Sequence, residues 1–189
     1  MNNQEIEVRF PDIDKEALLK KLRELGAEDH GEDLLEEMIF YSHPDGSIPD
    51  RFVRVRKARG RTELTYKNHY EHSATGTMEI QLDITDMETA KDFMLAIGWT
   101  QVRRQQKKRH DFVFNDCEIS IDEFPLAVSY VEIEGPSEEA LKETAAFLGL
   151  SWEDVYFKNA LMLLKEKRGL DVEKMKTYTF EKIEYVENT

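Results

Sequence analysis

The sequence has a single cysteine and no long apolar run, and both absences exclude whole classes of protein. With only Cys117 among 189 residues, neither an internal disulfide nor a cysteine zinc cluster is possible. Scarce cysteine is typical of a reducing compartment, so we expect a cytoplasmic protein. No apolar stretch approaches the roughly 18 residues that a membrane-spanning helix needs. The first ten residues also lack the basic and then apolar pattern of a secretory signal, and we expect no membrane partner.

Glycine-rich phosphate-binding motifs are absent as well. Neither GxxxxGK[ST] nor GxGxxG occurs, which excludes a P-loop and a Rossmann cradle. Positive charge is in deficit, because 39 acidic residues face 26 lysines and arginines for a formal net charge of −13. Nucleic-acid binding depends on neutralising phosphates, so this balance disfavours DNA or RNA as a partner. The length fits one domain, which we expect to span residues 1–189.

The basic residues that are present gather in two short segments. Residues 51–67 hold seven Lys/Arg and one acid, and residues 103–109 hold five Lys/Arg and no acid. These 24 residues carry 12 of the 26 basic side chains, whereas residues 111–154 carry twelve acids and one base, Lys142. The segregation indicates either two solvated strand faces or a locally positive site inside an acidic protein.

An acidic, alternating strand followed by a helix of about three turns occurs three times. The strands begin at Glu5, Glu79 and Glu132. The helices that follow end at Gly26, Gly98 and Gly149, each glycine standing where a helix terminates. The second helix is predicted to start with a capping box formed by Thr85 and Glu88, and the third with Ser137 as its N-cap.

Further alternating segments predict more strands, which we place at 35–41, 51–58, 62–68, 101–108, 109–114 and 117–122. Arg59-Gly60 and Asn115-Asp116 predict the turns of two hairpins. About nine strands, mostly joined by hairpins, indicate an α+β domain with a largely antiparallel sheet. Ser151 is expected to cap another helix that runs through Leu164, and residues 178–189 to form an added strand or a tail.

Alternation along the strands separates charged from apolar side chains. Residues two apart in a strand point the same way, about 7 Å apart, so Arg54 and Arg56 share a face opposite Val53 and Val55. One such polar face is usually solvated. Here almost every strand repeats the pattern, and eight or nine of them could form a closed barrel with charges inside and helices packed outside. Buried charges need partners, so that interior would hold a charged ligand.

Those charged residues suit a triphosphate bound with a divalent metal. Arginine and lysine bind phosphate oxygens, and Mg²⁺ prefers carboxylate and phosphate oxygens. The cations that could surround the phosphates are Arg9, Arg54, Arg56, Lys67, Lys107 and Arg109. The carboxylates that could hold one or two metal ions are Glu5, Glu7, Glu79, Asp122, Glu132 and Glu134.

The N-terminal Glu5-x-Glu7-x-Arg9 resembles the ExExK signature of the CYTH superfamily, which comprises class IV adenylyl cyclases, thiamine triphosphatases and inorganic triphosphatases. Two segments, Leu25-Gly26-Ala27 and Tyr41-x-His43-Pro44, are most similar to the class IV cyclase-like branch. The resemblance covers about residues 4–165 and leaves 166–189 as a C-terminal extension. It continues through the segments Phe52-Val-Arg54-Val-Arg56, Leu64-Thr-Tyr-Lys67, Glu79, Lys107-x-Arg109, Ile121-Asp122 and Val131-Glu132-Ile133-Glu134.

The resemblance implies an eight-stranded antiparallel tunnel in which the basic residues bind a triphosphate and the carboxylates hold Mg²⁺ or Mn²⁺. It places catalysis at the signature positions Glu5, Glu7 and Arg9. The implied partner is a small-molecule triphosphate, namely tripolyphosphate, ATP or thiamine triphosphate, bound by a monomer or homodimer.

Three functions are compatible with such a site. The first is metal-dependent hydrolysis of a triphosphate, and the second is cyclisation of ATP to cyclic AMP and pyrophosphate. The third is a polyphosphate- or nucleotide-binding module without turnover. Two departures from the signature make the third plausible: Arg9 replaces the lysine, and Gln81 stands where an acid is common.

Overall fold

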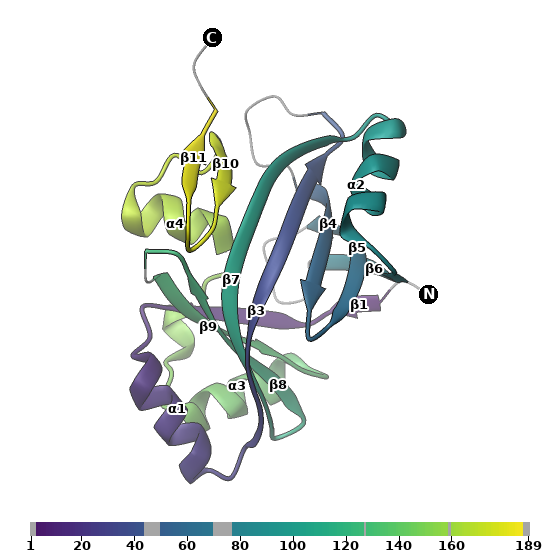
Figure 1. The fold of residues 1–189 in the computed structure, drawn as a ribbon. Helices are drawn as coiled ribbons and strands as arrows, with labels where there is room; N and C mark the ends of the chain where they lie inside the picture. The colour runs from purple at the N-terminus through teal and green to yellow at the C-terminus, as the bar shows by residue number, and fades with distance from the viewer. Residues whose placement is uncertain (1–2, 44–49, 70–76, 127, 159, 187–189) are drawn as a thin grey trace.

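The strands of the protein form one curved sheet. The computed structural model describes residues 3–43, 50–69, 77–126, 128–158 and 160–186 (Figure 1). Nine strands follow one another in the order β1-β6-β5-β4-β3-β7-β8-β9-β2, and each neighbouring pair is antiparallel. Their bounds are β1 Asn3–Glu5, β2 Glu7–Pro11, β3 Glu28–Tyr41, β4 Arg51–Ala58, β5 Arg61–His69, β6 Thr77–Ile84, β7 Thr100–Phe114, β8 Cys117–Phe124 and β9 Val128–Glu134.

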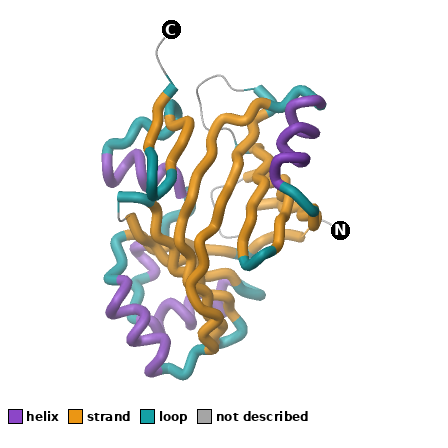
Figure 2. The backbone as a smooth tube through the Cα atoms, viewed as in Figure 1, coloured by secondary structure: helices purple, strands orange, loops and turns teal. Residues whose placement is uncertain are grey.

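The N-terminal segment forms both ends of this strand order. β1 pairs with β6, β2 pairs with β9, and only Ile6 separates β1 from β2. The segment therefore connects the first and the last strand of the path, and β1 and β2 together occupy one position of an eight-stranded antiparallel barrel. Figure 2 shows the helices lying outside the curved sheet. The predicted fold class, α+β with a barrel and external helices, is confirmed.

Four α-helices and a short 3₁₀ helix accompany the sheet. They are α1 Lys15–Glu24, α2 Met87–Ala96, α3 Glu138–Leu148, η1 Trp152–Asp154 and α4 Ala160–Arg168. Ser137 caps α3 as predicted, accepting a hydrogen bond from the Ala140 amide. The predicted capping box of α2 is wrong. Asp86 is the N-cap, because its carboxylate lies one residue nearer the helix and accepts from the Thr89 amide at 2.7 Å. None of the described helices is both long and apolar enough to cross a membrane.

Two strands are longer than the sequence predicted. The predicted strands 101–108 and 109–114 are one strand, β7, and the strand predicted at 35–41 already begins at Glu28. β3 and β7 pair with each other along their whole lengths. The backbone hydrogen bonds between them therefore continue through polar segments such as residues 28–33. Side-chain alternation is weak in these segments, so the sequence pattern did not predict them as strand.

The helix predicted from Ser151 through Leu164 is also wrong. Ser151 caps only η1, and the chain is extended at Val155. The Tyr156 amide then donates a hydrogen bond to the Arg9 carbonyl at 2.8 Å, forming a bridge to β2. In a continuous helix the Tyr156 amide would donate to a carbonyl four residues earlier in the same helix. Because it donates to Arg9 instead, the helix is interrupted, and α4 begins only at Ala160.

Both predicted hairpin turns are confirmed. Arg59 and Gly60, like Asn115 and Asp116, have positive φ angles, as a two-residue turn between twisted strands requires. The residues predicted to form a C-terminal extension contain β10 (Met175–Tyr178) and β11 (Ile183–Tyr185), and β10 pairs in parallel with β7. Of the two alternatives for residues 178–189, the added strand is therefore correct as far as residue 186.

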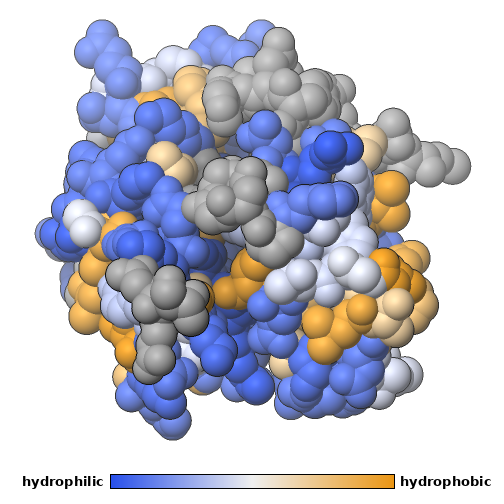
Figure 3. All heavy atoms as spheres, turned by 90° about the horizontal axis from the view of Figure 1, so that it is seen from above, coloured by the Kyte–Doolittle hydropathy of each residue, from blue (hydrophilic) through white to orange (hydrophobic). Residues whose placement is uncertain are grey.

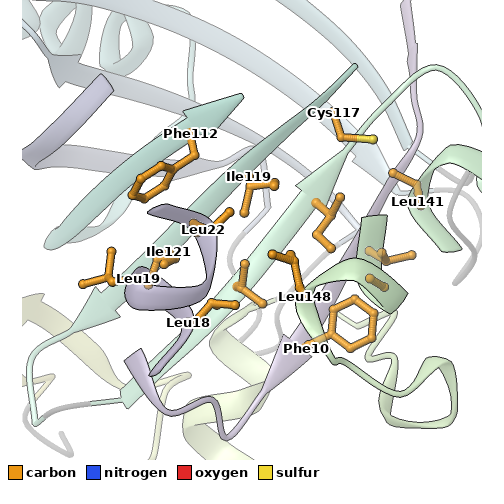
Figure 4. Packing of buried hydrophobic residues seen from close by; sticks show 14 residues of the cluster. Phe10, Leu18, Leu19, Leu22, Phe112, Cys117, Ile119, Ile121, Leu141 and Leu148 are labelled. Carbon is orange, nitrogen blue, oxygen red and sulfur yellow. The ribbon is translucent and has the colours of Figure 1, made fainter. Parts of the chain in front are cut away.

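The largest hydrophobic cluster lies between α1, α3 and the outer faces of β2, β8 and β9 (Figure 4). Phe10, Leu22, Ile119 and Leu141 are at most 1% exposed there, and burial of each such side chain contributes about 1.5–3 kcal/mol. Because these apolar residues must face the helices, the residues that alternate with them face the inside of the barrel. Cys117 belongs to the same cluster, as expected of a core cysteine.

Candidate active site

A cavity of about 390 Å³ lies inside the barrel, and most of the side chains that line it are charged. From above, hydrophilic residues dominate this side of the molecule (Figure 3). All six cations predicted from sequence reach the cavity wall: Arg9, Arg54, Arg56, Lys67, Lys107 and Arg109. The glutamates on the wall are Glu7, Glu37, Glu63, Glu79, Glu118, Glu132 and Glu134. Two predicted residues are not among these: Asp122 lies behind the wall, and the side chain of Glu5 is outside the described residues.

The packing of β4 explains why its arginines point inward. Val53 and Val55 are buried with Met38 against α2. Arg54 and Arg56 alternate with these valines and therefore face the cavity, where their side chains are 12% and 14% exposed. The same alternation applies to every strand of the barrel.

Glu37 is a central carboxylate that sequence reasoning did not identify. It accepts from Arg56 Nε at 2.9 Å and from Gln105 Nε2 at 2.6 Å, and Arg54 Nη1 lies 3.8 Å away. Burial alone would raise the pKa of Glu37, but Arg56, Lys107 and Arg54 outweigh it and hold the pKa far below its ordinary value. A signal was available in the sequence, since Glu37 alternates with the apolar Met38 and Phe40 in the predicted strand 35–41.

Asp122 is fully buried and holds two of the cations in place. Its Oδ2 accepts from Lys107 Nζ at 2.7 Å, and Arg109 donates to both carboxylate oxygens at 2.7 Å. Tyr130 Oη adds a further hydrogen bond at 2.6 Å. Burial opposes ionisation, but the two cations keep the pKa of Asp122 below its ordinary value. Every oxygen of this carboxylate is thus already occupied.

Lys107 is the cation that the cavity destabilises most clearly. Burial lowers its pKa to about 8, with a further contribution from repulsion by Arg109. The charged form of Arg54 is destabilised in the same way, because burial and the neighbouring Arg56 lower its pKa. Its Nε is buried without a hydrogen-bond partner among the described residues. An anion bound in the cavity would stabilise the charged forms of Lys107 and Arg54 and raise their pKa values.

Arg9 bridges two carboxylates on adjacent strands. Its Nη2 lies 2.6 Å from Glu7 Oε1, and its Nε lies 2.8 Å from Glu132 Oε2. Burial works against its charge, but these two glutamates raise the pKa of Arg9 above its already high value. The guanidinium is therefore permanently charged and braces the two carboxylates.

Three glutamates face one another across neighbouring strands at one end of the cavity. Glu134 on β9 is directly opposite Glu7 on β2 and Glu118 on β8. Among the described residues, Glu134 has no ion pair or hydrogen bond. Its pKa is raised to about 7, first by burial and then by repulsion from Glu7, Glu132 and Glu118. Like charges in this register are destabilising, and a divalent cation would compensate them.

The donor set therefore fits a divalent metal, although it is not gathered around one point. Within the described part of the chain, no three Asp, Glu, His or Cys side chains already converge on a possible metal position. The remaining predicted ligand, Glu79 on β6, lies 2.8 Å from the Nζ of Lys67 on the neighbouring β5.

The barrel interior thus combines six cations with a row of glutamates on β2, β8 and β9, a charge pattern that suits a protein class binding small polyanions. The CYTH domain profile matches residues 3–178. The chain belongs to the CYTH family. No curated protein matches the chain.

Solved structures agree with this assignment. The PH1012 protein of Pyrococcus horikoshii OT3 has 26% sequence identity and a TM-score of 0.72, over 84% of this chain and 98% of that one. A candidate adenylate cyclase from Vibrio parahaemolyticus has 16% identity and a TM-score of 0.70, over 87% of this chain and 99% of that one. HpAC1 from Hippeastrum, a candidate adenylyl cyclase with dominant triphosphatase activity, has 14% identity and a TM-score of 0.60, over 89% and 99%. The last two likenesses show a shared fold.

Proposed function

We propose that this protein is a divalent-metal-dependent triphosphatase that hydrolyses the terminal phosphoanhydride of a triphosphate. The proposal rests above all on the six cationic side chains that line one cavity of about 390 Å³. One of them, Arg54, is only weakly held by internal pairing, because it lies no nearer than 3.8 Å to its ion-pair partner Glu37. A polyanion carrying several charges is the ligand class that such an interior accommodates.

Each cation has a proposed role in binding. Arg54 and Arg56 contact the phosphates from β4, and Lys107 and Arg109 contact them from β7, on the other side of β3. Lys67 extends the same basic surface on β5. Asp122 was a predicted metal ligand, but we assign it to positioning Lys107 and Arg109, because both of its oxygens accept from them. Planar guanidinium groups and a buried ammonium bind terminal phosphate oxygens through charge-assisted hydrogen bonds.

The glutamates on β2, β8 and β9 are the proposed metal ligands. Glu7, Glu132 and Glu134 retain that role from the sequence prediction, and Glu118 joins them because it faces Glu134 across the sheet. When bound, a divalent cation such as Mg²⁺ or Mn²⁺ would neutralise phosphate oxygens and lower the pKa of a coordinated water. Glu5 and Glu79 remain further candidates.

In the proposed reaction, the oxygen of a water molecule forms a bond to the terminal phosphorus while the bond to the bridging oxygen breaks. The leaving group departs as a diphosphate, stabilised by the β4 and β7 cations, and the water proton passes to solvent. Arg9 cannot accept this proton because its guanidinium stays charged. Its role is to hold Glu7, which orients the water. Positioning and charge neutralisation supply most of the catalysis in phosphoryl transfer.

The test measures products and binding together. Purified protein is incubated with tripolyphosphate, ATP or thiamine triphosphate and Mg²⁺ or Mn²⁺. Orthophosphate release supports the proposal; cyclic AMP with pyrophosphate supports a cyclase instead, and binding without products supports a module without turnover. Arg54→Ala should weaken triphosphate binding by about 10- to 100-fold, as expected for a charge-assisted contact. Arg51→Ala is the matched control, since Arg51 is exposed on the same strand. Equal behaviour of the two variants would refute the assignment of the cavity.

A further inference from the structure

Gln105 contributes an unused hydrogen-bond acceptor to the cavity. It lies on β7, lines the cavity and is only 5% exposed. Its Nε2 donates to Glu37 Oε2 at 2.6 Å. Since a carboxylate can only accept here, this contact identifies the remaining amide atom as the carbonyl oxygen. That Oε1 is buried, and no described residue donates a hydrogen bond to it. Buried acceptors in folded proteins normally have a donor, supplied by protein, water or ligand.

Apolar side chains stand on both sides of this acceptor. β3, one neighbour of β7, contributes Ile39 and Tyr41 to the cavity wall beyond Glu37. On the other side, Phe124 at the end of β8 and Leu161 on α4 line the same cavity. Phosphate oxygens gain nothing from an apolar surface, whereas a carbon-containing group is stabilised by burial against it. This part of the cavity therefore differs in chemistry from the basic and acidic parts.

The C-terminal extension holds Gln105 in position. β8 ends before it reaches the level of Gln105, and β10 pairs with β7 there instead, with Tyr178 opposite Gln105 (Figure 1). Two residues away, the fully buried Arg103 donates its Nε to the Met175 carbonyl at 3.2 Å. The backbone of β7 is thus fixed on both edges where Gln105 points inward.

We propose that this part of the cavity is a subsite for the organic portion of an organic triphosphate. Gln105 Oε1 accepts a hydrogen bond from a hydroxyl or amino group of that portion, and the apolar residues pack against its carbon framework. The inference rests on the proposed function, because it adds a subsite for the organic portion of the ligand to the proposed triphosphate site. Tripolyphosphate has no carbon framework, so the subsite selects triphosphate esters over the inorganic compound.

The experiment compares two adjacent glutamines on opposite faces of β7. Full-length wild type, Gln105→Met and Gln106→Met are assayed for equilibrium binding of ATP and of tripolyphosphate in EDTA, and for kcat/KM with Mg²⁺. Methionine keeps the length of the side chain and removes its amide. Gln106 is the matched control, because it bonds Glu36 outside the cavity at 3.2 Å. Leu161→Gln serves as a second variant that disturbs the apolar surface and leaves Gln105 intact.

We expect Gln105→Met to lower the ATP-to-tripolyphosphate preference by about 10-fold, as loss of one buried hydrogen bond to the ligand predicts. Leu161→Gln should lower it in the same direction, and Gln106→Met should leave it unchanged. An equal loss for both ligands in Gln105→Met and Leu161→Gln, or no loss in either, would overturn the subsite while triphosphate binding stands. If the wild type binds neither compound, the proposed function itself fails.

Discussion

The two sides of the cavity handle their charges in different ways. On the basic side, formed by β3, β4 and β7, buried carboxylates are placed among the cations: Glu37 lies beside Arg56, and Asp122 of the neighbouring β8 lies beside Lys107 and Arg109. On the acidic side, formed by β2, β8 and β9, Arg9 compensates Glu7 and Glu132, but Glu134 has no cation paired with it among the described residues. The difference shows which charges belong to the folded framework and which are left for ligands.

The largest effect should come from breaking the compensated side. Asp122→Asn would remove the ion-pair partner of the buried Lys107 and the shortest ion pair of Arg109, which would keep Glu132 at 3.3 Å, and we expect it to lower the unfolding free energy by about 3–5 kcal/mol. Chemical denaturation measures this loss. The exposed pair Lys142–Glu138 provides the control, and Lys142→Ala should change stability by no more than about 0.5 kcal/mol. Similar values for the two variants would show that Asp122 is not an anchor of the basic side.

On the acidic side, removing the charge of Glu134 should raise the stability of the fold rather than lower it. Glu134 has its pKa raised from 4.5 to about 7, so its ionisation destabilises the fold progressively as pH rises through that interval. At pH 8, Glu134→Gln should therefore raise the unfolding free energy of the metal-free protein by about 1–2 kcal/mol, allowing for its partial exposure to solvent.

The same substitution should abolish stabilisation by metal. Mg²⁺ or Mn²⁺ should raise the melting temperature of the wild type, because an ion that binds only the folded state stabilises it. In Glu134→Gln this increase should be largely lost, together with metal-dependent turnover. A variant that is less stable without metal, yet keeps the full response to Mg²⁺, would contradict the assignment of Glu134 to the metal.

The smallest effect concerns pH and the basic side alone. With a pKa of about 8, Lys107 is protonated below that value and loses its charge as pH rises above it. Binding of tripolyphosphate in EDTA should therefore be constant below about pH 7 and weaken by a few-fold between pH 8 and 9.5. Isothermal titration across this range tests the prediction. Lys107→Arg, whose charge does not titrate, should remove the step, and a step of equal size in that variant would assign the titration to another group.

Much of the site could be predicted from sequence because strand alternation determines which face a residue occupies. Alternation placed Arg54, Arg56 and Lys107 on the inward face, and all three line the cavity. Glu37 escaped notice because it ends a run of acids, 28–37, that resembles a solvated segment. The separation of η1 from α4 could not be predicted either. It depends on the hydrogen bond between Tyr156 and Arg9, which lie 147 positions apart in the chain.

The sequence by itself determined the structural elements and the charged residues of this protein. These are the antiparallel strands, the two hairpin turns, and a polar face that carries the cations and carboxylates of a CYTH domain. The tertiary structure decided how those charges are used. Asp122 and Glu134 look alike in sequence, each an inward acid on an alternating strand. Asp122 is fully compensated by Lys107 and Arg109, whereas Glu134 faces Glu7 and Glu118. Alternation selects the face, but the register between strands distant in sequence selects the partners, and only the folded barrel fixes that register.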